Sequence, residues 1–145
     1  PAVAYLIAGG DFRVPRPNAV IVTETPQEII SDKVRSLLER RYLKGRDLCD
    51  VWHLRNVLNT AVNIEIIERK FKMYIEPFMA RRSMDFFAVL MKESKASMTT
   101  AISQDLSRFL PSDVFEVQRQ GSFDAYIVAV QSLFKELKDK GVRLP

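Results

Sequence analysis

Three ionisable residues occupy positions where apolar residues are expected. Two successive stretches of the chain repeat their apolar residues at the spacing of amphipathic helices, about 100° per residue. Lys33 falls on the apolar face of the first stretch, one turn after Ile29 and one turn before Leu37. Asp47 falls in the apolar arc of the second stretch, and Asp50 lies at its edge. Because a buried charge is costly unless it is paired or binds a ligand, the spacing predicts a polar cluster.

The residues of this cluster allow more than one role. Lys33 could lay its stem on apolar surface and reach water with its ammonium. Asp47 could cap the second helix or interact with its first turn. Asp50 could form a structural ion pair with Lys33, Arg46 or Arg41. Periodicity alone therefore predicts a cluster of a lysine and two aspartates but does not name its chemistry.

The cysteine and histidine content excludes several kinds of site. Cys49 is the only cysteine, so no disulfide can form within the chain, which fits a reducing compartment. His53 is the only histidine, so a zinc site built from Cys and His ligands is excluded. A Ser–His–Asp triad would need His53, and no nucleophile-elbow pattern accompanies it. We expect His53 at the surface and Cys49 packed as a small hydrophobe.

Two short strands and about six helices are expected to position these residues. The strands are predicted at Val3–Ala8 and Ala19–Thr23, separated by Gly9-Gly10 and by a proline-rich turn. The first helix starts with a capping box, Thr25-Pro26-Gln27-Glu28, and Gly45 is expected to separate it from the second. The predicted helices cover about 25–41, 47–58, 64–75, 77–92, 98–109 and 123–140.

These elements predict a mostly α fold, α+β overall. We expect a helical bundle of about five or six helices over residues 25–145. Residues 1–24 would hold the two strands, which are too few for a stable sheet of their own. We therefore expect them to complete a sheet that begins upstream of this chain.

Apolar residues of the later helices are expected to form the core. Trp52 is expected in the core rather than as a base-stacking platform. The C-terminal helix should pack on the bundle through Tyr126, Ile127, Val130, Leu133, Phe134 and Leu137. A series of apolar residues between 73 and 90 also has helical spacing. We expect it in the core, and a partner interface is the alternative. The series comprises Met73, Phe78, Met79, Met84, Phe86, Phe87 and Leu90.

The stretch that contains the cluster resembles a known family. Residues 28–54 read EIISDKVRSLLERRYLKGRDLCDVWHL. This is similar to the AbiEii-type nucleotidyltransferase pattern E-I-x-A-D/E-K-L-x-A-L-x-x-R followed by R-D-L-Y-D-L-W-x-L. The departures are mild: Ser31 replaces Ala, Cys49 replaces Tyr, and Val51 replaces Leu. The matching positions are Glu28, Ile29, Asp32, Lys33, Leu37, Arg40 or Arg41, Arg46, Asp47, Leu48, Asp50, Trp52 and Leu54.

The resemblance implies a function for the cluster. The family consists largely of toxins of toxin–antitoxin or phage-defence systems, in which a polymerase-β-like core precedes a helical C-terminal region. It implies NTP as nucleotide donor, Mg²⁺ as cofactor, an RNA acceptor, which is tRNA in characterised relatives, and a possible protein antitoxin. Lys33 would contact the donor phosphates, with Arg41 close to phosphate. Asp47 would position or deprotonate the acceptor hydroxyl, supported by Asp50 and Arg46.

One part of the family's chemistry is missing from this sequence. Transfer with two metal ions commonly uses an Asp-x-Asp pair after a Gly-Ser/Thr turn, and no two aspartates here are separated by a single residue. Asp11 follows Gly9-Gly10, but no carboxylate follows it at the needed spacing. We therefore expect no metal site in this chain, no cofactor bound by it alone, and an inactive C-terminal part whose metal carboxylates lie upstream.

Charge and hydropathy leave two other interpretations open. The net charge is +4, and basic residues cluster at 33–46 and at 69–82. They are expected to be solvated helix faces, but a non-catalytic helical module that binds RNA or a partner protein is the alternative. A third interpretation is a helical protein whose cluster is purely structural. The longest apolar run, Ala2 to Gly10, is too short to span a membrane, so a cytoplasmic protein without membrane contact is expected.

Overall fold

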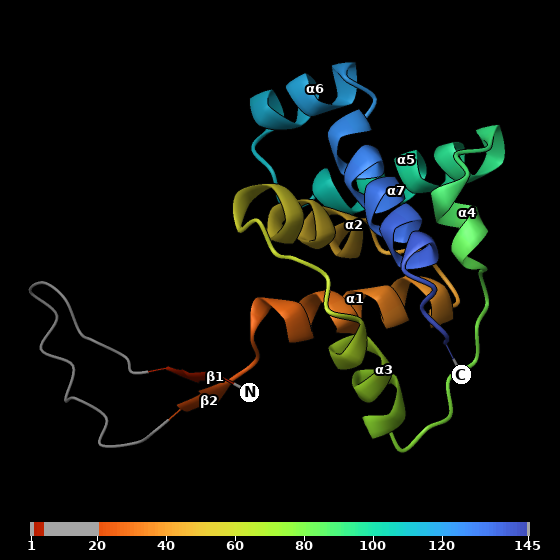
Figure 1. Ribbon diagram of the computed structural model, residues 1–145. Helices are drawn as coiled ribbons and strands as arrows, with labels where there is room; N and C mark the ends of the chain where they lie inside the picture. The colour runs from red at the N-terminus through yellow and green to blue at the C-terminus, as the bar shows by residue number, and fades with distance from the viewer. Residues whose placement is uncertain (1, 5–20, 145) are drawn as a thin grey trace, which may run out of the picture.

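The computed structural model describes residues 2–4 and 21–144. Strand β1 (Ala2–Ala4) pairs antiparallel with β2 (Ile21–Thr23), with Ala2 opposite Thr23. The rest of both predicted strands and the turns between them lie outside the described residues. Within the described part, β1 and β2 pair only with each other, beside the start of the helical body (Figure 1). A nucleotidyltransferase-like sheet is therefore not confirmed.

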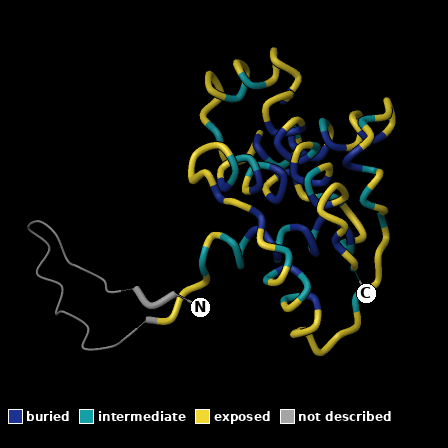
Figure 2. Tube along the Cα trace, in the orientation of Figure 1, coloured by how far each residue is buried: buried dark blue, intermediate teal, exposed yellow. Residues whose placement is uncertain are grey.

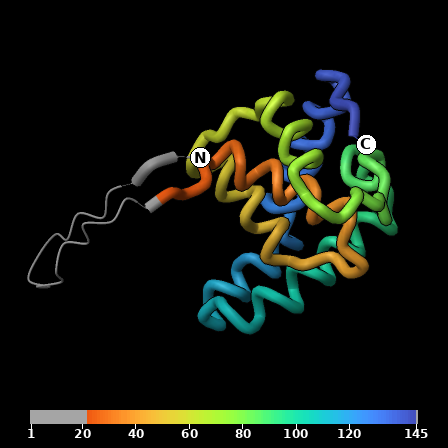
Figure 3. Tube along the Cα trace, turned by 90° about the horizontal axis from the view of Figure 1, so that it is seen from below, coloured from red at the N-terminus to blue at the C-terminus, as the bar shows by residue number. Residues whose placement is uncertain are grey.

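The predicted mostly helical fold is confirmed. The described residues form seven α-helices and one π-helix, η1. Figures 1 and 3 show α3 and α6 on opposite sides of the body, with α1 and α2 between them. The helices are α1 (Pro26–Glu39), α2 (Gly45–Trp52), η1 (His53–Val57), α3 (Ile64–Met73), α4 (Met84–Ala88), α5 (Lys92–Leu106), α6 (Ser112–Gln120) and α7 (Asp124–Asp139).

Helix α1 begins with the predicted capping box. The Glu28 N–H donates to Thr25 Oγ1 at 3.3 Å, and the Thr25 N–H donates to Glu28 Oε2 at 2.7 Å. These bonds satisfy two backbone donors that the first turn cannot pair internally. The backbone and side-chain hydrogen bonds from Thr25 lower the pKa of Glu28 to about 2.

Gly45 begins α2, whereas the sequence predicted a break there and a helix start near Asp47. The reason is packing rather than turn formation. A Cβ at Gly45 would lie 2.3 Å from Ala101 O and 2.6 Å from Ile102 Cα, both on α5. Only glycine allows the backbones of α2 and α5 to approach so closely.

The second predicted helix ends as a π-helix, and this corrects the position of Leu58. The Leu58 N–H donates to His53 O at 3.0 Å, which is the i→i+5 bond of a π turn. The wider turn rotates the following side chains relative to an α-helix. Leu58 is therefore half-exposed, while Leu48, Val51 and Leu54 are buried as predicted.

The predicted helix at 77–92 is wrong for most of its length. Only α4 (Met84–Ala88) and Lys92, the first residue of α5, are α-helical there, and α5 thus begins before the predicted residue 98. Ser83 caps α4 and accepts a hydrogen bond from the Phe86 N–H. Residues 77–83 instead bind the end of α1, where the N–H groups of Arg81 and Arg82 both donate to Leu38 O. Two backbone N–H groups of this segment thus bind another helix, a contact that local periodicity does not predict.

Helix α7 lies at the centre of the core and contacts α2, α4 and α5. The apolar face predicted for it is fully confirmed, since all six of its residues are buried. The Phe87 ring from α4 stacks on Phe134 with centroids 4.5 Å apart, and Trp52 meets Tyr126 edge-on at 5.3 Å. Figure 2 shows the buried segments gathered at this crossing.

Two expectations about the periphery need correction. Helix α6 was not predicted, and none of its residues is buried, so no apolar stripe marks it in the sequence. Met73 and Met79 were expected in the core but are 67% and 68% exposed, because the chain between α3 and α4 runs over the surface. Phe87 of the same series is buried, and Phe78, Met84, Phe86 and Leu90 are partly buried. No helix among the described residues is long and apolar enough to cross a membrane.

Candidate functional site

Lys33 connects α1 to α2. Its Nζ lies 2.9 Å from Asp47 Oδ1 and 2.6 Å from Asp50 Oδ2. The capping box places Lys33 on the inner side of α1, and the Gly45 contact with α5 fixes the start of the helix that carries both aspartates. The predicted cluster of one lysine and two aspartates is therefore present in the fold.

Asp47 is the buried member of this cluster. Only 2% of its side chain is exposed, and its second oxygen, Oδ2, lies 2.9 Å from Arg40 Nη1. That contact has the distance of an ion pair, yet no described residue gives Oδ2 an aligned hydrogen bond. Asp47 is thus a buried carboxylate held between two cations, which offset the cost of its burial.

The environment keeps Lys33 protonated. Burial would lower its pKa, but hydrogen bonds and charges from Asp50 and Asp47 outweigh burial, so the pKa lies above the ordinary value. Lys33 is an ammonium at neutral pH and cannot act as a base there. With 22% of its side chain exposed, and with three N–H donors on the ammonium, it can still reach an anion outside the protein.

Asp50 forms the outer side of the cluster, and half of its side chain is exposed. Lys33 and Arg40 together balance Asp47 and Asp50, so these four residues carry no net formal charge. The arrangement can position cations for a phosphate group and offers one accessible carboxylate. It contains no nucleophile.

Arg41 and Arg46 lie away from these contacts. Both are exposed, and the Arg41 guanidinium lies over the Tyr42 ring, 5.2 Å from its centroid. The Arg46 N–H donates to Asp105 Oδ2 at 3.3 Å. No described contact joins either guanidinium to Lys33 or Asp47, so their predicted phosphate-binding roles stay predictions.

Arg40 is the member of the cluster that the sequence did not single out. Counted from Glu28, the arginine of the family pattern falls on Arg40, whereas the phosphate role was predicted for Arg41. A signal was available, because Arg40 follows Lys33 by seven residues and therefore lies on the same side of α1. The cluster is thus Lys33, Arg40, Asp47 and Asp50.

The four residues of the cluster lie within the part of the chain that matches a known family. Residues 4–129 match the family model described as the nucleotidyl transferase AbiEii toxin of a type IV toxin–antitoxin system. The chain belongs to the AbiEii family. Among curated proteins and solved structures, no match was found.

Two residues of the second basic group of this AbiEii chain, Lys70 and Arg82, form internal contacts. Lys70 pairs with Asp32 at 3.0 Å and with Glu24, and Asp32 also accepts a hydrogen bond from Tyr74 at 2.6 Å. Burial and the neighbouring Asp32 raise the pKa of Tyr74 to about 12. These bonds fix α3 against α1.

Two arginines that the sequence placed among solvated faces are structural. Arg35 is 6% exposed and binds Glu39, Phe71 O and Glu76 O while its guanidinium lies 4.1 Å from the Tyr74 ring centroid. Arg82 donates hydrogen bonds to the carbonyl oxygens of Leu37, Arg40 and Arg41, at and just beyond the end of α1. The interpretation of these basic residues as solvated faces is therefore wrong for Arg35 and Arg82.

The AbiEii chain as described does not fit a metal site. No group of three or more His, Cys, Asp or Glu side chains among the described residues could hold a metal ion. Within the cluster, Asp47 and Asp50 already face the cations Lys33 and Arg40. Carboxylates that bind Mg²⁺ need free oxygens that converge on one point, and these do not provide them.

Other residues singled out in the sequence have structural positions. His53 is exposed, and Trp52 is partly buried against the core. Cys49 is packed against the core, and burial, with the charges of Asp50 and Asp105, raises the pKa of its thiol to about 12. These positions agree with the predictions for all three.

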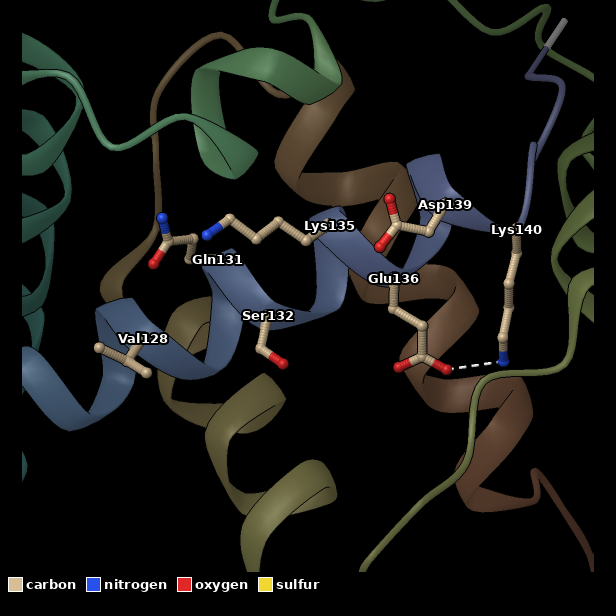
Figure 4. A pocket seen from close by; sticks show the side chains of 7 residues that line it. All are labelled: Val128, Gln131, Ser132, Lys135, Glu136, Asp139 and Lys140. Carbon is tan, nitrogen blue, oxygen red and sulfur yellow. Dashed lines mark hydrogen bonds and ion pairs between the residues drawn. The ribbon is translucent and has the colours of Figure 1, made fainter.

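The hollow along α7 is a different surface from the cluster. It has a volume of about 550 Å³ and is lined by residues of α7, with Glu136 and Lys140 paired across one turn (Figure 4). Glu136 also pairs with Arg55 at 2.7 Å. Glu136 is thus paired twice within the protein, and the family match, which includes the segment with Lys33, ends at residue 129, before Glu136, so the Lys33 cluster is the better candidate site.

Proposed function

We propose that this chain is the helical part of an AbiEii nucleotidyltransferase that transfers NMP from an NTP to an RNA acceptor, with tRNA as the expected acceptor. The observation that carries the proposal is the position of Lys33 between Asp47 and Asp50, within the segment that the family model covers. A permanently charged ammonium at a partly exposed position suits the binding of donor phosphates.

Lys33 and Asp47 are proposed as the functional pair of this region. Lys33 would bind the donor phosphates and Asp47 would set its position, supported by Asp50. Because Asp47 is buried between two cations, a role in positioning is better supported than proton transfer to or from a substrate. The phosphate role proposed for Arg46 would use its exposed guanidinium group.

The complete enzyme is proposed to use Mg²⁺ and NTP. Mg²⁺ would stabilise the charge that develops on the transferred phosphoryl group. Since the described carboxylates do not fit a metal site, other carboxylates would hold it. We propose that residues 1–24 are the end of a nucleotidyltransferase core and residues 25–145 its helical domain, so that this chain alone is inactive and binds no cofactor.

The cellular setting follows from the family description. A toxin of a type IV toxin–antitoxin system implies a protein antitoxin as counterpart. We propose a cytoplasmic site of action and a role in phage defence, where RNA acceptors are available. A helical module that only binds RNA is less well supported, because Arg35, Lys70 and Arg82 form internal contacts.

The test is transfer of labelled NTP to total tRNA in the presence of Mg²⁺. The chain described here is compared with the complete gene product that contains it. The proposal expects RNA labelling by the complete product and none by this chain alone. Labelling by neither protein, with each of the four NTPs supplied in turn, would overturn the proposal and favour a binding role.

A further inference from the structure

We infer that Arg40, rather than its neighbour Arg41, is the second phosphate-binding residue of this site. The inference rests on the proposed function and deepens it, since it names the residue that acts beside Lys33. The ligand chemistry is a phosphate oxyanion, supplied either by the NTP or by the RNA backbone.

Arg40 faces the cluster and solvent at once. Its Nη1 lies 2.9 Å from Asp47 Oδ2, while 41% of its side chain is exposed. A guanidinium has five N–H donors, and the described residues provide no partner for it other than Asp47. Most of its donors are therefore free for a ligand, in a planar fork that matches a phosphate group.

The contact with Asp47 fixes the position of Arg40 but uses only one nitrogen of its guanidinium. The ion pair uses Nη1, so the other N–H groups of the guanidinium can bind a phosphate while the contact with Asp47 stays in place. Asp47 contacts Lys33 through one oxygen and Arg40 through the other. A single buried carboxylate thus contacts two cations, and each of them is partly exposed.

The main chain directs Arg40 and Arg41 to different sides. Arg82 donates from Nη1 to Leu37 O at 3.1 Å and to Arg40 O at 2.6 Å, and from Nη2 to Arg41 O at 3.0 Å. These bonds satisfy carbonyl groups at and just beyond the C-terminal end of α1, where a cation is favourable. With this turn fixed, Arg40 points to Asp47 and Arg41 to the Tyr42 ring.

Space for a ligand adjoins Arg40. A hollow of about 520 Å³ lies between α1 and the segment from Met73 to Glu76, and Arg40 is part of its wall. The carboxylates of Asp32 and Glu39 in this wall are neutralised by Lys70 and Arg35. Glu76 adds one exposed carboxylate to the rim. A phosphate group can therefore approach Arg40 from this side with little opposing charge.

The experiment compares Arg40→Gln with Arg41→Gln, adjacent substitutions that remove the same charge. Binding of ATP, inorganic tripolyphosphate and a fluorescent hexauridylate to the complete gene product that contains this chain is measured by titration at several salt concentrations. Arg40→Gln should weaken binding about tenfold or more, while Arg41→Gln stays within about twofold. If the hexauridylate is the ligand affected, its salt slope should fall by about 0.7.

The three probes identify the source of the phosphate. If Arg40→Gln loses affinity for ATP and tripolyphosphate, Arg40 binds the phosphates of the nucleotide donor. If it loses affinity for hexauridylate alone, Arg40 binds the RNA backbone. Both outcomes support the inference. Arg40→Lys should restore part of the affinity, since it keeps the charge but not the fork. Urea unfolding of each variant shows whether it is folded. If Arg40→Gln does not fold, the affinity of Arg40→Lys for the three probes is compared with that of the unsubstituted protein instead.

Other outcomes separate the inference from the proposed function. Equal losses for Arg40→Gln and Arg41→Gln, or no loss for Arg40→Gln while Lys33→Met abolishes binding, would overturn the inference alone. If the unsubstituted gene product binds none of the three probes, the phosphate site of the proposed function fails, and the inference fails with it.

Discussion

Lys33 of α1 lies 2.9 Å from Asp47 of α2, and the carboxylate is buried while the ammonium reaches the surface. The pair therefore has a structural side and a solvent side. Asp47 also neutralises Arg40 at 2.9 Å, so one carboxylate fixes two cations of the AbiEii cluster. Each side of this arrangement can be tested separately.

The structural side is tested by Asp47→Asn. The substitution leaves Lys33 with Asp50 alone and Arg40 without its acidic partner, so the free energy of unfolding should fall by about 1–3 kcal/mol. Urea unfolding followed by circular dichroism measures the change. Asp50→Asn is the matched control, because Asp50 is half-exposed and its loss should cost less than about 1 kcal/mol. Equal losses for the two variants would contradict the account of Asp47.

Gly45 is predicted to tolerate no side chain. Gly45→Ala would place a Cβ 2.3 Å from Ala101 O and force α2 away from α5, lowering the free energy of unfolding by about 3 kcal/mol. Gly121→Ala is the control, since its Cβ would lie 3.6 Å from Gln118 O, an ordinary contact. This substitution should change stability by about 0.5 kcal/mol or less. Thermal or urea unfolding of both variants decides the point, and a neutral Gly45→Ala would show that the helices are not in backbone contact.

Cys49 provides a chemical reporter inside the second helix. Burial, with Asp50 and Asp105, raises its pKa from 9.0 to about 12, so the folded chain should hold about a thousandfold less thiolate at pH 8 than the unfolded chain. The rate of reaction with an aromatic disulfide reagent, in buffer and in urea, measures this difference. Asp50→Asn should raise the rate in the folded state. A rate in buffer equal to that in urea would contradict the packing described for α2.

The capping box predicts a pH dependence at the start of α1. The backbone hydrogen bond from Thr25 lowers the pKa of Glu28 from 4.5 to about 2. A lowered pKa in the folded state means that the stabilisation is complete above about pH 4.5 and is lost as the pH falls toward about 2. The difference in unfolding free energy between the unsubstituted chain and Glu28→Gln should shrink across this window. A constant difference from pH 5 to pH 2 would argue against an ionised Glu28 in the box.

Much of the site could be predicted because its signals are local. The capping box fixes the register of α1, and one lysine inside an apolar stripe identifies Lys33. The two aspartates occur in the apolar arc of α2, so their meeting with Lys33 follows from two adjacent amphipathic helices. The family pattern added the expected chemistry but not the geometry.

The rest of the site depends on contacts between distant segments. The family pattern places its arginine at Arg40, but it does not predict the contacts of Arg82, far along the chain, that fix the turn in which Arg40 faces Asp47. Residues 77–83 read as helical but use their backbone donors on α1. The π turn before Leu58 likewise changes the exposed face without a recognised sequence signal. Such features are set by tertiary packing, which periodicity does not report.

The most direct test of the central claim is Lys33→Met in the complete gene product, assayed for Mg²⁺-dependent transfer of labelled NTP to tRNA. Lys72→Met is the matched control, since it removes the same charge from an exposed position on α3. The account predicts that Lys33→Met lowers the rate about 100-fold or more while Lys72→Met leaves it nearly unchanged. Transfer by a folded Lys33→Met variant at the unsubstituted rate would contradict the assignment of this cluster to the active site.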